Sequence, residues 1–458
     1  MMIHRYTKNG LNFVLDVNSG AVHLLDDLCY AVSGLTDETM GEDCPQAVCA
    51  ALPQYDVADV REAWAELLEL KKNGQLYADD DYIDVSRYIP VGAPVKALCL
   101  HVAHDCNLRC KYCFASTGDF GQGRKIMPPE VAKKAIDFVV ARSGARHNIE
   151  VDFFGGEPLM AWDTVVQTVD YARSLEKVNN KKFRFTITTN GVLLDEEKRE
   201  YINENMDNVV LSLDGRPAVN DEFRKTVNGQ GSYDVIVPKF KALVDARDPQ
   251  KDYYARGTFT SHNLDFANDV THIADAGFDR LSVEPVAADA GCGYDLTEAD
   301  LSKIDAEYDR LTEIMIERRK AGKPFTFFHF MVDLDQGPCV VKRLRGCGAG
   351  YEYVAVTPDG DIYPCHQFVG KEEFKQGNVF DGSFDMGIAQ RFAGMNIYTR
   401  PKCRECWAKF YCSGGCSAAN FNMNGDMNDS YDLGCEMERK RLECAIYLKA
   451  LDKMCKDS

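Results

Sequence analysis

The sequence predicts a mixed α/β fold: a partial (β/α)6 TIM-like barrel, preceded by a small module of winged-helix type and followed by a cysteine-rich domain. Strand and helix patterns alternate six times between about residues 95 and 290, which indicates a parallel sheet covered by helices. Short strands and two helical patterns precede this region. After about residue 330 the periodicity weakens, and cysteine, glycine and aromatic residues become frequent. We therefore divide the chain into 1–86, 87–300, 301–330 and 331–458.

The N-terminal module begins with two or three short strands separated by turn signals. Asn9-Gly10 marks the first turn and Asn18-Ser19-Gly20 the second. Two helical patterns follow, and the second ends at Gly74. We interpret the acidic stretch 77–85 (YADDDYIDV) as a return strand. This combination resembles a winged helix-turn-helix, but the acidity of the module argues against binding to DNA.

The six strand–helix units set the place where chemistry is expected. A charged helical pattern over 298–323 closes the region as a bridging element. In barrels of this kind the active site lies at the carboxyl ends of the strands. The candidate motifs of this region fall at such strand ends. The strand patterns cover 95–104, 148–158, 181–191, 208–215, 253–261 and 279–287.

The overall charge and the cysteine content limit the class of protein. The net charge of −18 repels phosphate backbones and anionic lipid, so we expect neither nucleic acid nor a membrane as a partner. The N-terminus lacks the apolar segment of a signal peptide, and no stretch approaches the length of a membrane span. We therefore expect a cytoplasmic protein. In that compartment 18 cysteines indicate metal binding rather than disulfides.

Three cysteines follow the first barrel strand at the spacing CxxxCxxC, namely Cys106, Cys110 and Cys113. A 4Fe-4S cluster takes one thiolate for each iron, so three thiolates leave one iron open to an exchangeable ligand. A structural zinc site would need a fourth ligand, which His101 or His104 could supply. The open iron is favoured because of the motifs on the following strands.

These motifs are short and glycine-rich. GGEP (155–158) ends the second strand, TTNG (188–191) the third and LSLDG (211–215) the fourth. Glycine lets a ligand approach the backbone closely, and Glu157 can accept hydrogen bonds from an ammonium group. Ser212 and Asp214 are placed to bond sugar hydroxyls, although ordinary capping and turn roles explain either one in isolation.

Taken together, CxxxCxxC with an aromatic residue before its last cysteine, GGEP and LSLDG resemble the radical S-adenosylmethionine (SAM) superfamily. The resemblance implies that SAM chelates the open iron through its amino and carboxylate groups. One electron would then split SAM into methionine and a 5′-deoxyadenosyl radical that abstracts hydrogen. By the same resemblance Cys106, Cys110 and Cys113 hold the cluster. The residues implied to contact SAM are Tyr112, Gly155, Gly156, Glu157, Asn190, Ser212, Asp214, Arg224 and Arg256.

A second cysteine group lies in the C-terminal region and resembles the SPASM domain, an extension of radical SAM enzymes that modify peptides and proteins. The resemblance implies two auxiliary 4Fe-4S clusters, and thus three in total. The first set is one ligand short, which leaves Cys339 or a substrate thiolate to complete it. A pair of zinc knuckles is the alternative. The implied ligands are Cys347, Cys365 and Cys416 for the first cluster, and Cys403, Cys406, Cys412 and Cys435 for the second.

The segments 3–27 and 345–370 look like the maturases of six-cysteine (SCIFF) peptides. This resemblance implies thioether bridges between a cysteine and a threonine, or another acceptor, of a ribosomal precursor peptide. The N-terminal module would bind the leader of that peptide as an added strand. A ferredoxin or flavodoxin would supply electrons. The candidates for the chemical step are Cys339, Asp214 and Glu284.

Two further functions stay open. A formylglycine-forming sulfatase maturase or an epimerase would use similar motifs, but a sulfatase maturase would not need residues 1–86. A non-enzymatic iron-sulfur electron carrier would explain the cysteines, but it would not explain GGEP, LSLDG and the strand–helix alternation.

Overall fold

The structure is a computed structural model that describes residues 2–85, 93–335 and 340–457. Cys339 and the predicted boundary at 86/87 lie outside the described residues. The strands are β1 (Ile3–Lys8), β2 (Leu11–Asp16), β3 (Val22–Leu25), β4 (Ala97–His104), β5 (Lys125–Ile126), β6 (Asn148–Gly155), β7 (Lys182–Thr189), β8 (Asn208–Ser212), β9 (Asp252–Phe259), β10 (Arg280–Pro285), β11 (Thr326–Phe327), β12 (Tyr353–Val356), β13 (Asp361–Tyr363) and β14 (Gly377–Asn378).

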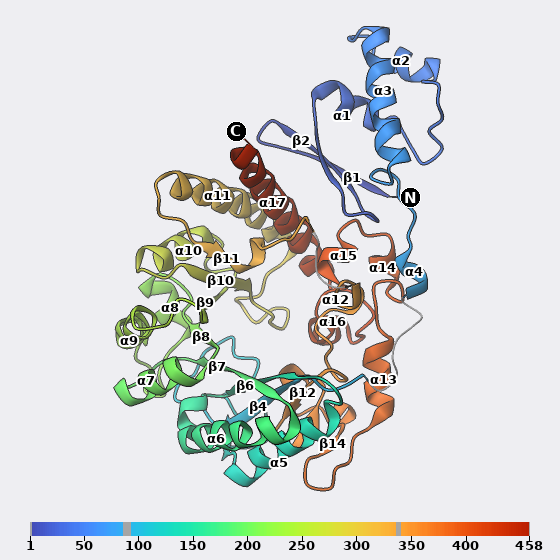
Figure 1. The fold of residues 1–458 in the computed structure, drawn as a ribbon. Helices are drawn as coiled ribbons and strands as arrows, with labels where there is room; N and C mark the ends of the chain where they lie inside the picture. The colour runs from blue at the N-terminus through green and yellow to red at the C-terminus, as the bar shows by residue number, and fades with distance from the viewer. Residues whose placement is uncertain (1, 86–92, 336–339, 458) are drawn as a thin grey trace.

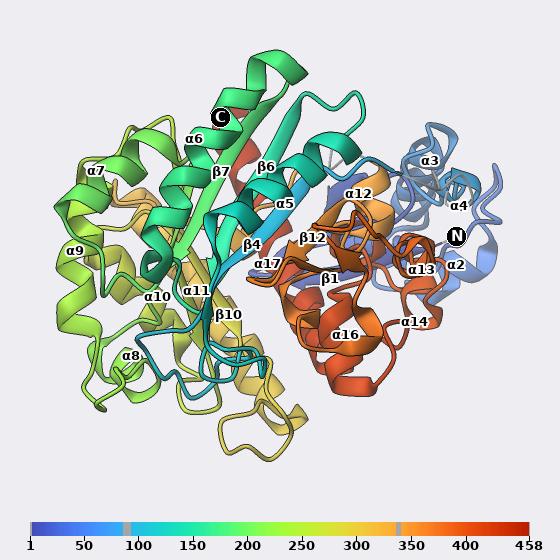
Figure 2. The same ribbon diagram turned by 90° about the horizontal axis from the view of Figure 1, so that it is seen from below.

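The helices alternate with the strands in the middle of the chain and dominate its C-terminal part (Figures 1 and 2). They are α1 (Asp27–Ser33), α2 (Gln46–Ala51), α3 (Val57–Lys72), α4 (Tyr82–Val85), α5 (Pro129–Arg142), α6 (Trp162–Asn179), α7 (Glu196–Asn205), α8 (Pro217–Phe223), α9 (Tyr233–Asp245), α10 (Phe266–Asp275), α11 (Leu301–Lys320), α12 (Val340–Arg345), α13 (Met386–Gly394), α14 (Pro401–Arg404), α15 (Lys409–Cys412), α16 (Ser417–Asn424) and α17 (Asp432–Asp457).

One large sheet organises the molecule. Its strands follow the order β11-β10-β9-β8-β7-β6-β4-β12-β13-β14, and β5 pairs with β4 beside this path. Neighbouring strands from β11 to β12 pair in parallel. The six strands that the sequence predicts are β4 and β6 to β10, so the parallel α/β sheet is confirmed (Figure 1). The closure of this sheet into a partial barrel stays a prediction.

The cysteine-rich region shares this sheet. β12 pairs in parallel with β4, and β13 and β14 continue from it with antiparallel pairing. In this register Ala355 of β12 lies opposite Cys99 of β4. The strands that lead to the two cysteine groups are therefore hydrogen-bonded neighbours.

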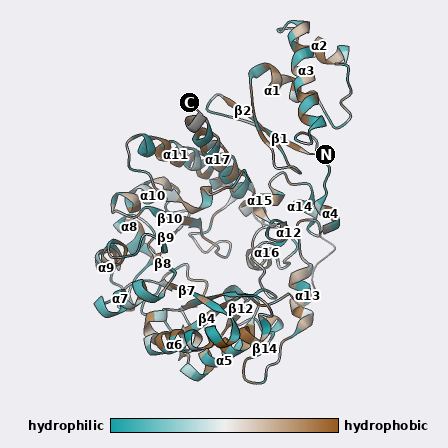
Figure 3. Cartoon of the chain, in the orientation of Figure 1, coloured by the Kyte–Doolittle hydropathy of each residue, from teal (hydrophilic) through white to brown (hydrophobic). Residues whose placement is uncertain are grey.

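The two faces of the sheet differ in burial. Along β6 to β9 almost every second residue is buried, and most of these residues belong to one apolar core together with residues of α5, α6 and α9 to α11. A parallel sheet is usually buried on both faces. Here the alternate residues are partly exposed, so the second face is open to a ligand. These residues include Asp152, Thr186, Ser212, Arg256 and Thr258. Figure 3 shows hydrophobic and hydrophilic segments interspersed along α5 and α6, as expected for helices with one buried face.

The N-terminal module contains the three-stranded antiparallel sheet β1-β2-β3. Asn9 and Gly10 form the predicted turn, with φ of 49° and 78°. Phe13 and Leu15 of β2 pack on Ile446 and Tyr447 of α17. The module is thus seated on the C-terminal helix. Its assignment as a winged helix stays a prediction.

The predicted return strand over 77–85 is wrong, because this stretch contains turns and the short helix α4. Aspartate disfavours strands, and the carboxylate of Asp80 binds side chains of another region, so this stretch does not pair as a strand. It accepts hydrogen bonds from the Lys409 ammonium at 3.0 Å and from the Tyr398 hydroxyl. The segment therefore ties the N-terminal module to the cysteine-rich region.

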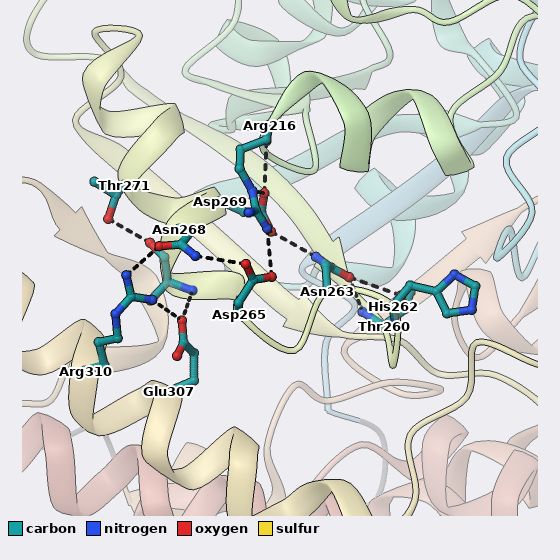
Figure 4. A network of polar contacts seen from close by, with 11 residues as sticks. Arg216, Thr260, His262, Asn263, Asp265, Asn268, Asp269, Thr271, Glu307 and Arg310 are labelled. Carbon is teal, nitrogen blue, oxygen red and sulfur yellow. Dashed lines mark hydrogen bonds and ion pairs between the residues drawn. The ribbon is translucent and has the colours of Figure 1, made fainter.

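A polar network anchors the loop after β8 on α10 (Figure 4). The Arg216 amide and Nε donate to Asp269 Oδ1 at 3.0 and 2.8 Å, and Asn263 Nδ2 donates to Asp269 Oδ2 at 3.1 Å. A Cβ on Gly215 would lie 2.3 Å from the Asp269 side chain. The network therefore fixes the end of the LSLDG motif. Among the described residues no helix is both long and apolar enough to span a membrane.

Candidate functional site

The three cysteines of the CxxxCxxC motif lie in the loop that leaves β4, and each is partly buried. The Cys106 sulfur accepts hydrogen bonds from the Leu108 amide at 3.3 Å and from Asn190 Nδ2 at 3.6 Å. Burial raises the pKa of the Cys106 thiol and of the Cys110 thiol to about 12. Binding to a cationic iron would offset this cost of ionisation. The three thiols are thus neighbours in this loop, and their role as ligands of one cluster stays a prediction.

The glycines of GGEP bring the end of β6 directly against this cysteine loop. A Cβ on Gly155, whose φ is 127°, would lie 2.2 Å from the Ala103 carbonyl oxygen. A Cβ on Gly156 would lie 2.1 Å from the Asp105 carbonyl oxygen. Glycine is therefore required at both positions to hold the two loops together.

We expect Gly155→Ala to destabilise the protein by about 3 kcal/mol, because strain at positive φ adds to the clash with Ala103. Chemical denaturation of the purified protein measures this. Gly394→Ala at the end of α13 is the matched control, since its new Cβ meets no atom within 4 Å. Equal stability of the two variants would contradict the close approach.

Glu157 is fully buried, and its carboxylate is held mainly by residues at the end of β7. It accepts hydrogen bonds from the Leu159 amide at 3.0 Å, the Thr189 hydroxyl at 2.7 Å and the Asn190 amide at 2.8 Å. Burial outweighs these bonds and raises its pKa to about 7. In this conformation Glu157 positions GGEP beside TTNG. The predicted contact of Glu157 with the ammonium group of SAM stays a prediction.

Tyr112, Asp214 and Arg224 form a second buried unit beside the cysteine loop. The Tyr112 hydroxyl donates to Asp214 Oδ2 at 2.5 Å, and Arg224 Nε lies 3.0 Å from Asp214 Oδ1. The Thr258 amide donates to Asp214 Oδ1 at 3.0 Å. Burial raises the pKa of Asp214, and Arg224 opposes that effect. The Asp214 carboxylate therefore orients Tyr112 and Arg224 here, whereas its predicted contact with the ribose of SAM stays a prediction.

The remaining predicted site residues lie at the end of β8, inside β9 and near the end of β10. Ser212 is half-buried, and its register partner on β9 is Arg256. The Arg256 guanidinium forms an ion pair with Glu284. Burial raises the pKa of Glu284, but Arg256 and His329 outweigh it and lower the pKa below its ordinary value. Glu284 is thus ionised at neutral pH and lies beside the cysteine-rich region.

The seven cysteines of the C-terminal region gather as two sets. Burial first, and then the neighbouring Cys416 and Cys347 thiols, raise the pKa of Cys365. Burial and then Cys403 raise the pKa of Cys435 to about 11, with Cys406 also near. Cys412 is close to the other three members of this second set. The structure thus brings together the members of each predicted set, while their roles as ligands stay a prediction.

Buried donors without partners test whether these residues fit iron-sulfur clusters. Asn107 Nδ2, beside Cys106, and Arg400 Nε, near the C-terminal cysteines, are buried and make no hydrogen bond. Such donors suit the sulfur atoms of a cluster, which accept hydrogen bonds. The two donors and the neighbouring thiols therefore fit clusters.

The alternative zinc ligands are placed differently. The rings of His101 and His104 are hydrogen-bonded to each other at 3.1 Å, and both rings contact Phe120. Burial lowers the pKa of His104 to about 4. The pair forms part of the aromatic core under the cysteine loop.

Three residues of this region were not identified from the sequence. Asp152 lies on the open face of β6, where burial and then Glu150 raise its pKa to about 7. The polar residues at every second position of this parallel strand, Asn148, Glu150 and Asp152, are the signal that could have identified it, because parallel strands are usually buried on both faces. His329 and Arg400 had no such signal, because loops of weak periodicity carry them.

Comparisons with known proteins agree with this geometry. Residues 100–252 match the radical SAM superfamily, and residues 347–407 match the iron-sulfur cluster-binding SPASM domain. The mycofactocin maturase MftC of Mycobacterium ulcerans is 29% identical over 340 residues, which cover 72% of this chain and 84% of the relative. A cysteine-type anaerobic sulfatase-maturating enzyme of Clostridium novyi is 25% identical over 328 residues, which cover 68% of this chain and 85% of the relative.

Solved structures share the fold. Native anSMEcpe with bound AdoMet superposes with a TM-score of 0.64 at 20% identity, covering 79% of this chain and 100% of that structure. SuiB of Streptococcus suis bound to S-adenosylmethionine gives a TM-score of 0.51 at 18% identity, covering 94% of this chain and 97% of that structure. The two domains imply SAM and 4Fe-4S clusters as bound groups. The chain therefore contains a radical SAM domain followed by a SPASM iron-sulfur cluster-binding domain.

Proposed function

We propose that this chain is a peptide-modifying radical SAM enzyme that installs thioether crosslinks, from cysteine to threonine or another acceptor, in a ribosomally made precursor peptide. The observation that carries the proposal is the arrangement of the open sheet face, the two cysteine regions and the N-terminal sheet. An open sheet face lies beside both cysteine regions, and an N-terminal sheet is seated on the C-terminal helix. The relatives named as maturases support the peptide as substrate class.

Three 4Fe-4S clusters and SAM would supply a 5′-deoxyadenosyl radical and a one-electron acceptor when bound. Cys106, Cys110 and Cys113 would hold the SAM-binding cluster, and the two C-terminal sets would hold the auxiliary clusters. Tyr112, Gly155 and Gly156 would border SAM. The open face, with Asp152, Arg256 and Glu284, would receive the acceptor residue and the cysteine of the peptide. A ferredoxin or flavodoxin would supply the electrons.

The leader of the precursor peptide would add a strand to the edge formed by β3. β3 is the end strand of the N-terminal sheet, and Leu24 on it is 40% exposed. Backbone hydrogen bonds along this edge would give affinity, and pockets for alternate side chains would give specificity. A sulfatase maturase or epimerase acting without such a leader would not use this edge.

The test uses anaerobically reconstituted protein, SAM, a strong reductant and a cysteine-rich precursor peptide. We expect a peptide lighter by two hydrogens, with fewer thiols that react with an alkylating agent, together with 5′-deoxyadenosine. Leu24→Pro inside β3 should weaken leader binding by about tenfold, because proline removes a backbone N–H from the middle of the short edge strand, while SAM cleavage persists. Leu35→Ala, exposed in the same module, is the control.

Each outcome separates the candidate functions. Formation of 5′-deoxyadenosine with an unchanged peptide would overturn thioether formation on that peptide. A formylglycine product on a sulfatase-derived peptide would favour the sulfatase-maturase alternative. Absence of SAM cleavage at full iron loading would favour an electron carrier.

A further inference from the structure

Arg400 connects the two C-terminal cysteine sets. It caps α14, and its carbonyl oxygen accepts a hydrogen bond from the Cys403 amide at 3.1 Å. Its side chain donates to the Gly414 carbonyl oxygen and, at 2.9 Å, to the Ser417 hydroxyl. Gly414 and Ser417 flank Cys416. One residue therefore holds a loop of each set.

The guanidinium of Arg400 is buried without an anionic partner among the described residues. Arg400 is 3% exposed, and its Nε makes no hydrogen bond. No described carboxylate forms an ion pair with it. The charged or chargeable groups around it are Cys347 and Cys416 of the first set and Cys403 and Cys412 of the second.

A buried cation without a counter-charge is costly, and removal of its partner usually destabilises a protein strongly. Neutral thiols do not supply that charge. Thiolates bound to iron-sulfur clusters do, since such clusters are held by ionised cysteines. Arg400 has two cysteines from each set near it, so both clusters would contribute to its compensation.

We propose that Arg400 is a counter-cation shared by the two auxiliary cluster sites, and that its positive charge raises the reduction potential of both. One-electron reduction adds a negative charge to a cluster, and a nearby cation in a dry environment stabilises the reduced state. The charge acts through the clusters, so Arg400 is a positioning residue. This inference depends on the cysteine sets and not on the peptide substrate.

The test compares Arg400→Gln and Arg400→Lys in full-length, anaerobically reconstituted protein. All samples carry alanine at Cys106, Cys110 and Cys113, so that the auxiliary clusters alone give the electron paramagnetic resonance signal. Bound iron and the midpoint potentials are measured. We expect Arg400→Gln to shift both potentials to more negative values, and Arg400→Lys to shift them less. Arg404→Gln, an exposed cation beside Cys403, is the control and should leave both unchanged.

Loss of iron in Arg400→Gln but not in Arg400→Lys would also support the proposal, because the retained charge would then permit assembly. Unchanged potentials in a fully loaded Arg400→Gln protein would overturn it. Equal loss of iron in both variants would overturn it as well, since the hydrogen bonds to Gly414 and Ser417, rather than the charge, would then explain the role of Arg400. None of these readouts requires the peptide reaction.

Discussion

Replacing Cys110 with alanine abolishes the cleavage of SAM to 5′-deoxyadenosine, with an expected loss of about three orders of magnitude or more. Cys110 lies in the loop after β4 between Cys106 and Cys113, beside Arg224 and Asp214. With one thiolate fewer, a cluster at this loop lacks a required ligand. Chromatography of the reaction mixture measures 5′-deoxyadenosine, and iron analysis should show a loss of about a third of the bound iron if three clusters are present.

Cys292→Ala provides the matched control for this variant. Cys292 is exposed in the loop after β10, and belongs to none of the cysteine sets. Its replacement should leave both the iron content and the cleavage of SAM unchanged. Cleavage of SAM at the wild-type rate by the Cys110→Ala protein would remove the loop after β4 from the reaction.

Asp214→Ala should destabilise the folded protein by about 3–5 kcal/mol. The Arg224 side chain is 11% exposed, and Asp214 is the carboxylate that pairs with it. Removal of Asp214 leaves this guanidinium buried without compensation, and it also leaves the Tyr112 hydroxyl and the Thr258 amide without their acceptor. Equilibrium urea denaturation of the purified protein measures the change in free energy of unfolding.

Two further variants separate the charge from the packing. Asp195→Ala removes an exposed aspartate that caps α7, and it should cost about 1 kcal/mol. The double variant Asp214→Ala, Arg224→Met removes both charges of this pair, so it should recover part of the lost stability. A single Asp214→Ala variant as stable as Asp195→Ala would show that the pair contributes no net stability.

Periodicity and spacing were sufficient for the large elements. The alternation of apolar residues with period two in β6 to β9, and with helical period in α5, α6 and α10, is a local property, so each element could be located from its own residues. The return strand predicted over 77–85 was wrong because the Asp80 carboxylate in this stretch binds Tyr398 and Lys409. Those partners lie more than three hundred positions away in the sequence.

The amino-acid sequence showed the cysteine motifs through their spacing, and the resemblance to the SPASM domain implied how the C-terminal cysteines divide into two sets. The tertiary structure decided what surrounds them. It placed the carboxylates of Glu157 and Asp214 among protein donors, seated the N-terminal sheet on α17, and buried Arg400 between two cysteine sets. Such contacts join residues far apart in the chain, and their energies depend on burial and partner geometry. Neither quantity is encoded in the spacing of residues along the sequence.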